Sequence, residues 1–239
     1  MAMNLKERLG AGEFLVGMRG KAGMGTPRIE AAREAGYDFI HVDAQHAPFD
    51  EQAMVEFCSR AEELDMPVTM RIKHTLDAYL IGRYCDLGVC GVEVPEVMTD
   101  TTVRESLNAF YYPPTGRRGW GGNHRLGFRE HSGRIEYAEF WNRTGTLWIQ
   151  VESIEAVTNA GLLAHSGVDI LSFGPQDLAF SIEAHPGTPF DTLEKCIRHV
   201  VDQLEGSSTA VAIRSSGPEE RGRFQDMGIR VLLERAPRQ

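Results

Sequence analysis

Residues 37–50 read YDFIHVDAQHAPFD and change abruptly from a strand-like to a polar sequence. The segment FIHV consists mostly of aromatic and β-branched residues, which suit a buried, pleated surface. Asp43, Gln45 and His46 then fall within four positions. A carboxylate and an imidazole at the end of a buried strand are a common arrangement in α/β active sites. The alternative is that Asp43 caps a turn and that His46 is an ordinary loop histidine.

Strand-like and helix-like segments alternate along the chain on both sides of this stretch. Strands are expected at residues 14–18, at the start of 37–50, and at 67–72, 89–94, 146–151, 168–173, 210–213 and 229–233. Helices are expected at residues 4–9, 28–35, 51–64, 76–87, 101–110, 135–143, 154–165, 192–204 and 219–227. Thr26 and Pro27 are expected as the N-cap and first-turn proline of the second helix. Such alternation predicts a parallel sheet with crossover helices.

Eight strands in 239 residues match a closed (β/α)8, or TIM, barrel. We therefore predict an α/β barrel that forms a single domain over residues 1–239. An open doubly wound sheet is the alternative, but Gly20, Gly23 and Gly25 do not fit the glycine-rich phosphate turn of such sheets. Residues 113–134 interrupt the alternation with six glycines and five arginines. A loop of this length is usually functional or part of an interface.

The composition narrows the class of protein. A net charge of −9 argues against a nucleic-acid or anionic-membrane surface, and 42% hydrophobic residues allow a sizeable core. The four cysteines form no C-x-x-C pair, so we expect no zinc cage or redox motif but a reduced, cytoplasmic protein with buried thiols. The N-terminal residues lack the apolar run of a signal peptide, and no window is long and apolar enough to cross a bilayer.

Polar side chains recur where the predicted strands end, which is where a barrel places its chemistry. They are Arg19 and Lys21; Asp43, Gln45 and His46; Arg71, Lys73 and His74; Glu93 and Glu96; Gln150 and Glu152; and Gln176 and Asp177. Glu152 and Asp177 come from neighbouring strands and could hold one Mg²⁺ or Mn²⁺ ion. The alternative for Asp177 is an N-cap of a short turn at residues 178–180. Glu152 follows a strand core, where burial of an unpaired carboxylate is costly.

These groups suggest a reaction class. Arg71 also ends a buried strand, and a basic residue there usually requires a balancing anion. A metal, an arginine and a histidine with an aspartate around one pocket suit a small oxo acid that must be enolised. The metal and the arginine stabilise the enolate, and the histidine moves protons.

The chain resembles the metal-dependent (class II) pyruvate aldolases, typified by 4-hydroxy-2-oxoheptanedioate aldolase and 2-dehydro-3-deoxyglucarate aldolase. The matching blocks, in the family's order, are AGYDFIHVDAQHAP, the MR of strand three, DLGVCGVEVPEV, YYPPTGRRG, QVES and FGPQDL. The resemblance implies a (β/α)8 barrel, usually a homo-oligomer, that cleaves or forms a C–C bond next to a pyruvate unit. It implies a divalent cation (Mg²⁺, Mn²⁺ or Co²⁺) and a small 2-oxo acid as substrate, with no nucleic-acid or membrane partner.

The resemblance also assigns roles to individual residues. It implies Glu152 and Asp177 as the metal ligands, Arg71 as the group that stabilises the enolate, and His46 with Asp43 as the acid/base pair. The oxo acid would be contacted by Arg71, Gln150, Gly174, Gln176 and Asp177.

The chain departs from the family pattern at several positions. Gln45 stands where the family usually has glutamate, and His41 occupies a strand position that is normally apolar. Lys21 and Lys73 add positive charge that suggests a more anionic substrate, such as a dicarboxylate, unless both are solvated loop residues. The sequence ends soon after the eighth strand, where the family has a further helix at an interface. The loop with Trp120 is the alternative interface.

Three functions stay open at this point. The first is a divalent-metal C–C lyase that acts on a 2-oxo acid. The second is a biosynthetic, citrate-synthase-like enzyme that condenses oxaloacetate on the same scaffold. The third is a weakened barrel that only binds a small anion.

Overall fold

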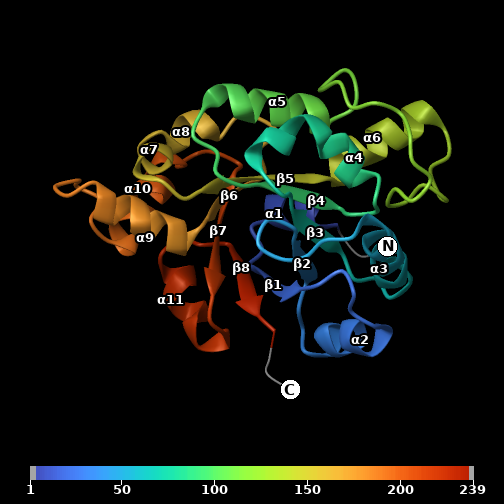
Figure 1. Cartoon of the computed structure of the whole chain (residues 1–239), viewed down its shortest axis with the longest axis horizontal. Coiled ribbons are helices and arrows are strands. Elements are labelled where there is room, and N and C mark those ends of the chain that lie inside the picture. The colour runs from blue at the N-terminus through green and yellow to red at the C-terminus, as the bar shows by residue number, and fades with distance from the viewer. Residues whose placement is uncertain (1–3, 237–239) are drawn as a thin grey trace.

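The computed structural model describes residues 4–236, and within them eight parallel strands close into a barrel (Figure 1). Each strand pairs with its neighbours in chain order, and β1 closes the ring with β8. The strands are β1 (Leu15–Gly20), β2 (Phe39–Asp43), β3 (Val68–Arg71), β4 (Gly91–Val94), β5 (Thr146–Val151), β6 (Ile170–Phe173), β7 (Ala210–Ser215) and β8 (Val231–Arg235). The predicted (β/α)8 barrel is therefore confirmed.

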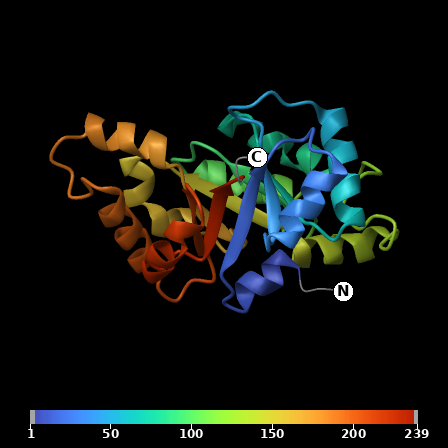
Figure 2. The ribbon, with the colours of Figure 1, turned by 90° about the horizontal axis from the view of Figure 1, so that it is seen from below.

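Helices surround the strands (Figure 1). They are α1 (Leu5–Gly10), α2 (Thr26–Glu34), α3 (Glu51–Glu63), α4 (Ile81–Cys85), α5 (Asp100–Phe110), α6 (Arg134–Thr144), α7 (Ile154–Thr158), α8 (Ala160–Leu163), α9 (Pro175–Ala184), α10 (Leu193–Gln203) and α11 (Arg221–Asp226), with 3₁₀ turns η1 (Thr75–Leu80) and η2 (Pro218–Glu220). Helix α1 lies beside the start of β1, at the end of the strands opposite the C label (Figure 2). Its Leu5 and Leu9 pack with the barrel interior, so α1 closes that end.

The core has two layers that follow from the alternation of side chains along each strand. One layer lies between the strands and the outer helices, and a smaller one fills the barrel itself. In β2, Phe39 belongs to the inner layer, and its ring occupies the space that a Cβ on Gly17 would need. The side-chain period of two then directs His41 and Asp43 inward as well, toward the carboxyl ends of the strands. The inner layer is thus apolar at the bottom and polar at the mouth.

Three strands each end two residues later than the sequence predicts, and β1 ends at Gly20 instead of Met18. Strand β7 continues to Ser215 and β8 to Arg235, because their backbone ladders continue past the last apolar residue. The expected limits of 213 and 233 were therefore wrong, and they left Arg214 and Arg235 outside the strands. Both arginines instead belong to strand ends at the mouth of the barrel.

Several helices also differ from expectation. Helix α2 begins at Thr26 with Gly25 as its N-cap, so Thr26 is not the cap. The helix expected at 76–87 is the 3₁₀ turn η1 followed by the short α4, and the helix expected at 154–165 breaks at Asn159 into α7 and α8. Helix α9 was expected at most as a short helical turn at residues 178–180. Asp177 lies in its first turn after the N-cap Gly174, so the role of Asp177 as an N-cap is wrong.

The long arginine-rich loop packs on the barrel through its own side chains. Arg118 is buried and donates to Asp86 at 2.7 Å, while the guanidinium of Arg125 stacks over Trp120 at 4.0 Å. These contacts give the loop a structural role, and its predicted role at an interface stays a prediction.

All four cysteines are buried and unpaired, as expected. Within residues 4–236 no helix is long and apolar enough to cross a membrane. Residues 237–239, to which the expected short C-terminus belongs, lie outside the described part.

Candidate active site

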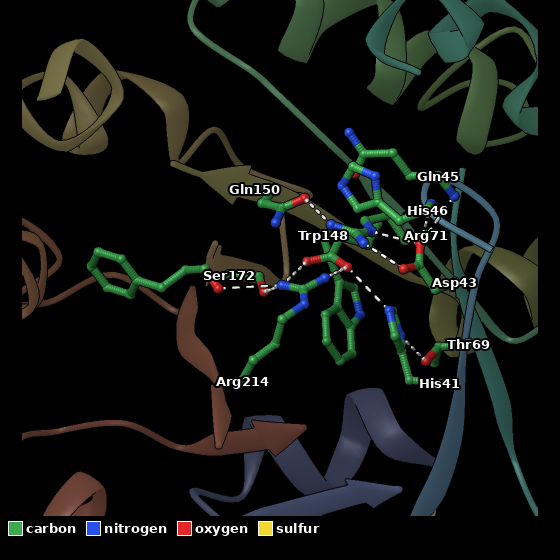
Figure 3. Close-up of polar contacts among 12 residues, drawn as sticks. His41, Asp43, Gln45, His46, Thr69, Arg71, Trp148, Gln150, Ser172 and Arg214 are labelled. Atoms are coloured by element: carbon green, nitrogen blue, oxygen red, sulfur yellow. Dashed lines mark hydrogen bonds and ion pairs between the residues drawn. The ribbon is translucent and has the colours of Figure 1, made fainter. Parts of the chain in front are cut away.

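A cavity of about 720 Å³ opens at the carboxyl ends of the strands. It brings together residues from β2, β3, β5, β7 and the start of α9, as expected for a barrel mouth. Its lining includes Asp43, His46, Arg71, Gln150, Gly174, Gln176 and Asp177, all of which the sequence singled out, and Arg214 and Arg235, which were missed or not used. Figure 3 shows the side chains of Asp43, His46, Arg71, Gln150 and Arg214 gathered in this region.

Arg71, the last residue of β3, is held rigidly in this cavity. Its Nε donates to Asp43 Oδ1 at 2.9 Å and its Nη2 to Asp43 Oδ2 at 2.6 Å, a bidentate pair (Figure 3). Nη1 lies 3.4 Å from Gln150 Oε1. The register of β2 and β3 places Asp43 directly opposite Arg71. Burial would raise the pKa of Asp43, but the hydrogen bond and charge of Arg71 hold it below its ordinary value.

The structure gives Asp43 a different partner from the one expected. Its carboxylate binds Arg71 and accepts from the backbone N–H of Gln45 at 3.0 Å and of His46 at 3.5 Å. Asp43 therefore orients the backbone around His46 rather than the imidazole itself. The His46 side chain is exposed to the cavity, where it can reach a bound substrate.

Glu152 follows β5 and is 6% exposed. Its Oε1 accepts from the backbone N–H of Glu96 at 2.6 Å, but its Oε2 is buried with no hydrogen-bond partner among the described residues. Burial, followed by the charges of Asp177 and Glu93, raises the pKa of Glu152 to about 7. A buried and unpaired carboxylate oxygen is costly unless a cation or proton meets it.

The space beside this oxygen is kept open by Gly174. A Cβ at that position would collide with Glu152 Oε2 and lie 2.6 Å from Gln150 Nε2. Asp177, in the first turn of α9, faces the same cavity. No cluster of three or more His, Cys, Asp or Glu ligands occurs within residues 4–236. Two carboxylates suit Mg²⁺ or Mn²⁺, which take their other ligands from water and substrate oxygens.

Gln45 lies beside this candidate metal centre and contacts it through Glu96. Its Nε2 donates to Glu96 Oε1 at 2.9 Å, and Glu96 has the unusual φ of 54° that turns its backbone N–H toward Glu152. Because Gln45 is neutral, it can pair with Glu96, whereas a glutamate there would repel it.

Sequence reasoning missed a buried charged cluster beneath the cavity. Glu93 of β4 is fully buried, and Arg214 of β7 binds it through Nη2 at 2.6 Å and Nη1 at 3.3 Å. His41 Nε2 lies 3.1 Å from Glu93, His41 Nδ1 lies 2.9 Å from Thr69 Oγ1, and its ring stacks on Trp148 (Figure 3). Burial alone would raise the pKa of Glu93, but Arg214 and His41 hold it far below its ordinary value. The sequence had singled out Glu93 at a strand end and His41 as a departure from the family, but it did not indicate Arg214 or the pairing of the three residues.

The basic residues after β1 and β3 separate in space. Lys21 lines a cavity beside the one described above. Lys73 lies over the ring of Phe49 at 5.4 Å, and His74 lies 3.4 Å from Glu96. Neither lysine lines the cavity described above, and the predicted preference for a more anionic substrate stays a prediction.

Comparison with known proteins finds relatives that share this fold. The model of the HpcH/HpaI aldolase/citrate lyase family matches residues 23–214. A hydroxypyruvate/pyruvate aldolase of Delftia acidovorans is 29% identical over 214 residues, which cover 88% of this chain and 78% of that protein. The crystal structure of an HpcH/HpaI aldolase from Desulfitobacterium hafniense matches with a TM-score of 0.86 at 26% identity, covering 99% and 91% of the two chains. A citrate synthase matches with a TM-score of 0.80 at 21% identity over 98% and 91%, which shows a shared fold alone.

Proposed function

The chain belongs to the HpcH/HpaI aldolase/citrate lyase family, and on that premise we propose that it is a divalent-metal-dependent aldolase of 2-oxo acids. It would break or form the C–C bond next to a pyruvate unit. The observation that carries the proposal is the buried Oε2 of Glu152, which has no partner in the described part of the chain and faces the space left by Gly174.

Glu152 and Asp177 would hold the cation, whether Mg²⁺, Mn²⁺ or Co²⁺. The bound cation would supply a Lewis acid for the oxygens of the 2-oxo acid. Because its pKa is raised to about 7, this carboxylate is only partly ionised at neutral pH unless a positive charge lies near it.

The remaining groups bind and orient the substrate. Arg71, fixed by Asp43, presents a guanidinium that binds the 2-oxygen as negative charge develops on it. Gln150 lies beside Arg71 and keeps that side chain in place. At the start of α9 the N–H groups of Gln176 and Asp177 have no partner within the helix, so they can bind the substrate carboxylate.

His46 would carry the proton. In cleavage its imidazole takes the proton of the 4-hydroxyl group, the C3–C4 bond breaks, and an aldehyde forms at C4. The electron pair of that bond passes to the pyruvate enolate, whose charge Arg71 stabilises. Return of the proton to C3 gives pyruvate and leaves the imidazole neutral.

A direct test is the release of pyruvate from a 4-hydroxy-2-oxo acid, measured by coupling to lactate dehydrogenase. We expect release with Mn²⁺ or Mg²⁺, loss with EDTA and recovery when metal is restored. Deuterium exchange at C3 of pyruvate without cleavage would point instead to enolisation that feeds another acceptor, as in a condensing enzyme. Absence of both metal binding and exchange would refute the aldolase and leave a barrel that only binds an anion.

The proposal extends to the setting of the enzyme. The four buried thiols suit a reducing compartment such as the cytoplasm. Leu76, Tyr79 and Leu80 are exposed apolar side chains of η1, which supports a homo-oligomer. Light scattering on the purified protein measures that assembly.

A further inference from the structure

Glu96 adopts a backbone conformation that is costly for a residue with a side chain. It follows β4 between the buried residues Pro95 and Val97, and its φ of 54° lies in the left-handed region that favours glycine. A glycine would make the same turn at lower cost. Backbone strain of this kind persists where the surrounding structure imposes it, and it concentrates at functional sites. We therefore looked for a role of the Glu96 side chain that glycine could not fill.

The backbone of Glu96 contacts the proposed metal ligand directly. Its N–H donates to Glu152 Oε1 at 2.6 Å, whereas Oε2 is the oxygen without a partner among residues 4–236. Gly174 lies beside Oε2, since a Cβ at that position would collide with it. The N–H of Glu96 thus fixes the rotation of the Glu152 carboxylate and leaves Oε2 directed at the space beside Gly174.

The side chain of Glu96 is held by the two preceding loops. Gln45, after β2, donates from Nε2 to Glu96 Oε1 at 2.9 Å. His74, after β3, has its Nε2 3.4 Å from Glu96 Oε2. Because His74 Nδ1 accepts from the backbone N–H of Leu76 at 3.0 Å, its ring proton lies on Nε2, which faces Glu96. We refer to the contacts of Gln45 and His74 with the Glu96 carboxylate as the Glu96 clamp.

Gln45 is itself anchored to the arginine that would bind the substrate. Its backbone N–H donates to Asp43 Oδ1 at 3.0 Å, and the same oxygen accepts from Arg71 Nε at 2.9 Å (Figure 3). A series of hydrogen bonds through the loops after β2 and β4 therefore connects Arg71 to Glu152. The group that would stabilise the enolate and the group that would hold the metal are kept in one relative position by the same contacts.

We propose that Glu96 is a positioning residue for the metal: held by the Glu96 clamp, it keeps the Glu152 carboxylate in the orientation that binds the divalent cation. This inference rests on the proposed function, because it concerns a ligand of that cation. It also gives Gln45 a role. The uncharged amide donates to Glu96, whereas an ionised glutamate in its place would offer no donor and would repel it.

The test is calorimetric titration of metal-free protein with Mn²⁺ in the absence of substrate. Gln45→Met removes the amide donor without a change of charge, so a loss of affinity reports position and not electrostatic attraction. We expect its dissociation constant for Mn²⁺ to rise about 3- to 10-fold, the range for the loss of one hydrogen bond. Gln52→Met is the matched control. Gln52 also donates to a glutamate, Glu56, at 3.2 Å, but on an exposed face of α3, so this variant should bind Mn²⁺ as the wild type does.

A double-mutant cycle separates the Glu96 clamp from other effects of the substitutions. Glu96→Gly keeps the backbone N–H and suits the positive φ, but it removes the carboxylate and should weaken Mn²⁺ binding. Gln45→Met added to Glu96→Gly should cause no further loss, because the clamp is already absent. The reversed pair, Gln45→Glu with Glu96→Gln, again joins an amide to a carboxylate at the same net charge. Its dissociation constant should return to within about twofold of the wild-type value. Urea unfolding of each metal-free variant checks that it is folded at the titration temperature.

The outcomes distinguish this inference from the proposed function. Equal Mn²⁺ affinities of wild type and Gln45→Met would overturn the positioning role while the proposed metal site stands. Losses that simply add in the double variant, or a reversed pair that binds Mn²⁺ no better than Gln45→Met, would also overturn it. If the wild type itself takes up no Mn²⁺, the proposed function fails and the inference fails with it.

Discussion

Replacement of Glu152 by glutamine tests whether this residue is a buried, ionisable ligand of the proposed metal. The substitution keeps the size of the side chain and the oxygen that accepts from Glu96, but it removes the charge on the buried Oε2. In the metal-free protein this charge lowers the free energy of unfolding, since nothing in the described part of the chain pairs with it. We therefore expect Glu152→Gln to stabilise the metal-free protein at alkaline pH while it destroys the metal site.

The magnitude follows from the pKa of this one group. The pKa of Glu152 is about 7 in the folded protein against an ordinary value of 4.5. A raised pKa favours folding below pH 4.5, and that contribution is lost as the pH rises through 7. Between pH 5 and pH 8.5 the linkage relation gives a loss of about 2.5 kcal/mol in the wild type that the glutamine variant lacks.

The assay is urea unfolding of EDTA-treated protein at several pH values between 5 and 8.5. The quantity of interest is the difference in free energy of unfolding between variant and wild type. Glu155→Gln, an exposed carboxylate three residues further along, is the matched control and should shift this difference by less than about 0.5 kcal/mol. Manganese added afterwards should stabilise the wild type and the control but not Glu152→Gln.

A difference that stays constant from pH 5 to pH 8.5 would show that Glu152 is not an isolated buried acid. The account of the metal centre would then lose its main support. Equal stabilisation of wild type and Glu152→Gln by manganese would refute the assignment of this residue as a ligand.

Three further predictions follow from the same site. Gly174→Ala should weaken Mn²⁺ binding, measured by calorimetry, at least about tenfold, because its Cβ would occupy the space beside Glu152. Gly119→Ala has open space around its Cβ and should bind Mn²⁺ as the wild type does. Equal affinities of the two variants would contradict this prediction. Asp43→Asn should lower the free energy of unfolding by about 2 kcal/mol, because Arg71 loses its bidentate partner. The same variant should reduce kcat far more than it changes KM, and an unchanged kcat would show that this pair is not needed for catalysis. Removal of metal should lower the free energy of unfolding by about 2.7 kcal/mol relative to protein with Mn²⁺ at 100 times its dissociation constant, and denaturation curves that are independent of Mn²⁺ would exclude a folded-state site.

Part of the candidate site could be read from the chain because it follows local rules. Residues at the ends of apolar, β-branched runs must reach the mouth of a parallel barrel, so Asp43, Arg71 and Gln150 were placed correctly near one another. The pairing within that group was not predictable. Asp43 could approach either His46 or Arg71, and the register of β2 against β3 decided for Arg71.

The residues that were missed lie beyond the apolar segments from which strands are predicted. Arg214 and Arg235 follow the last apolar residues of their strands, so a pattern of hydrophobicity ends the strand before them. Backbone pairing with the neighbouring strands continues regardless of polarity, which carries both side chains to the barrel mouth. The full length of helix α9 was missed for a related reason: its first turn is polar because it faces the cleft rather than the core.

The sequence by itself determined the eight-fold alternation, the closed barrel and the set of polar residues that had to meet at its mouth. These are consequences of side-chain period and strand propensity, which act over a few residues. Only the tertiary structure decided which charges are paired. It joined Glu93 to Arg214 across 121 positions of sequence, left Glu152 Oε2 without a partner among residues 4–236, and set Arg19 against Arg235. Electrostatic partners depend on distances across the barrel, and those distances exist only after the ring of strands has closed.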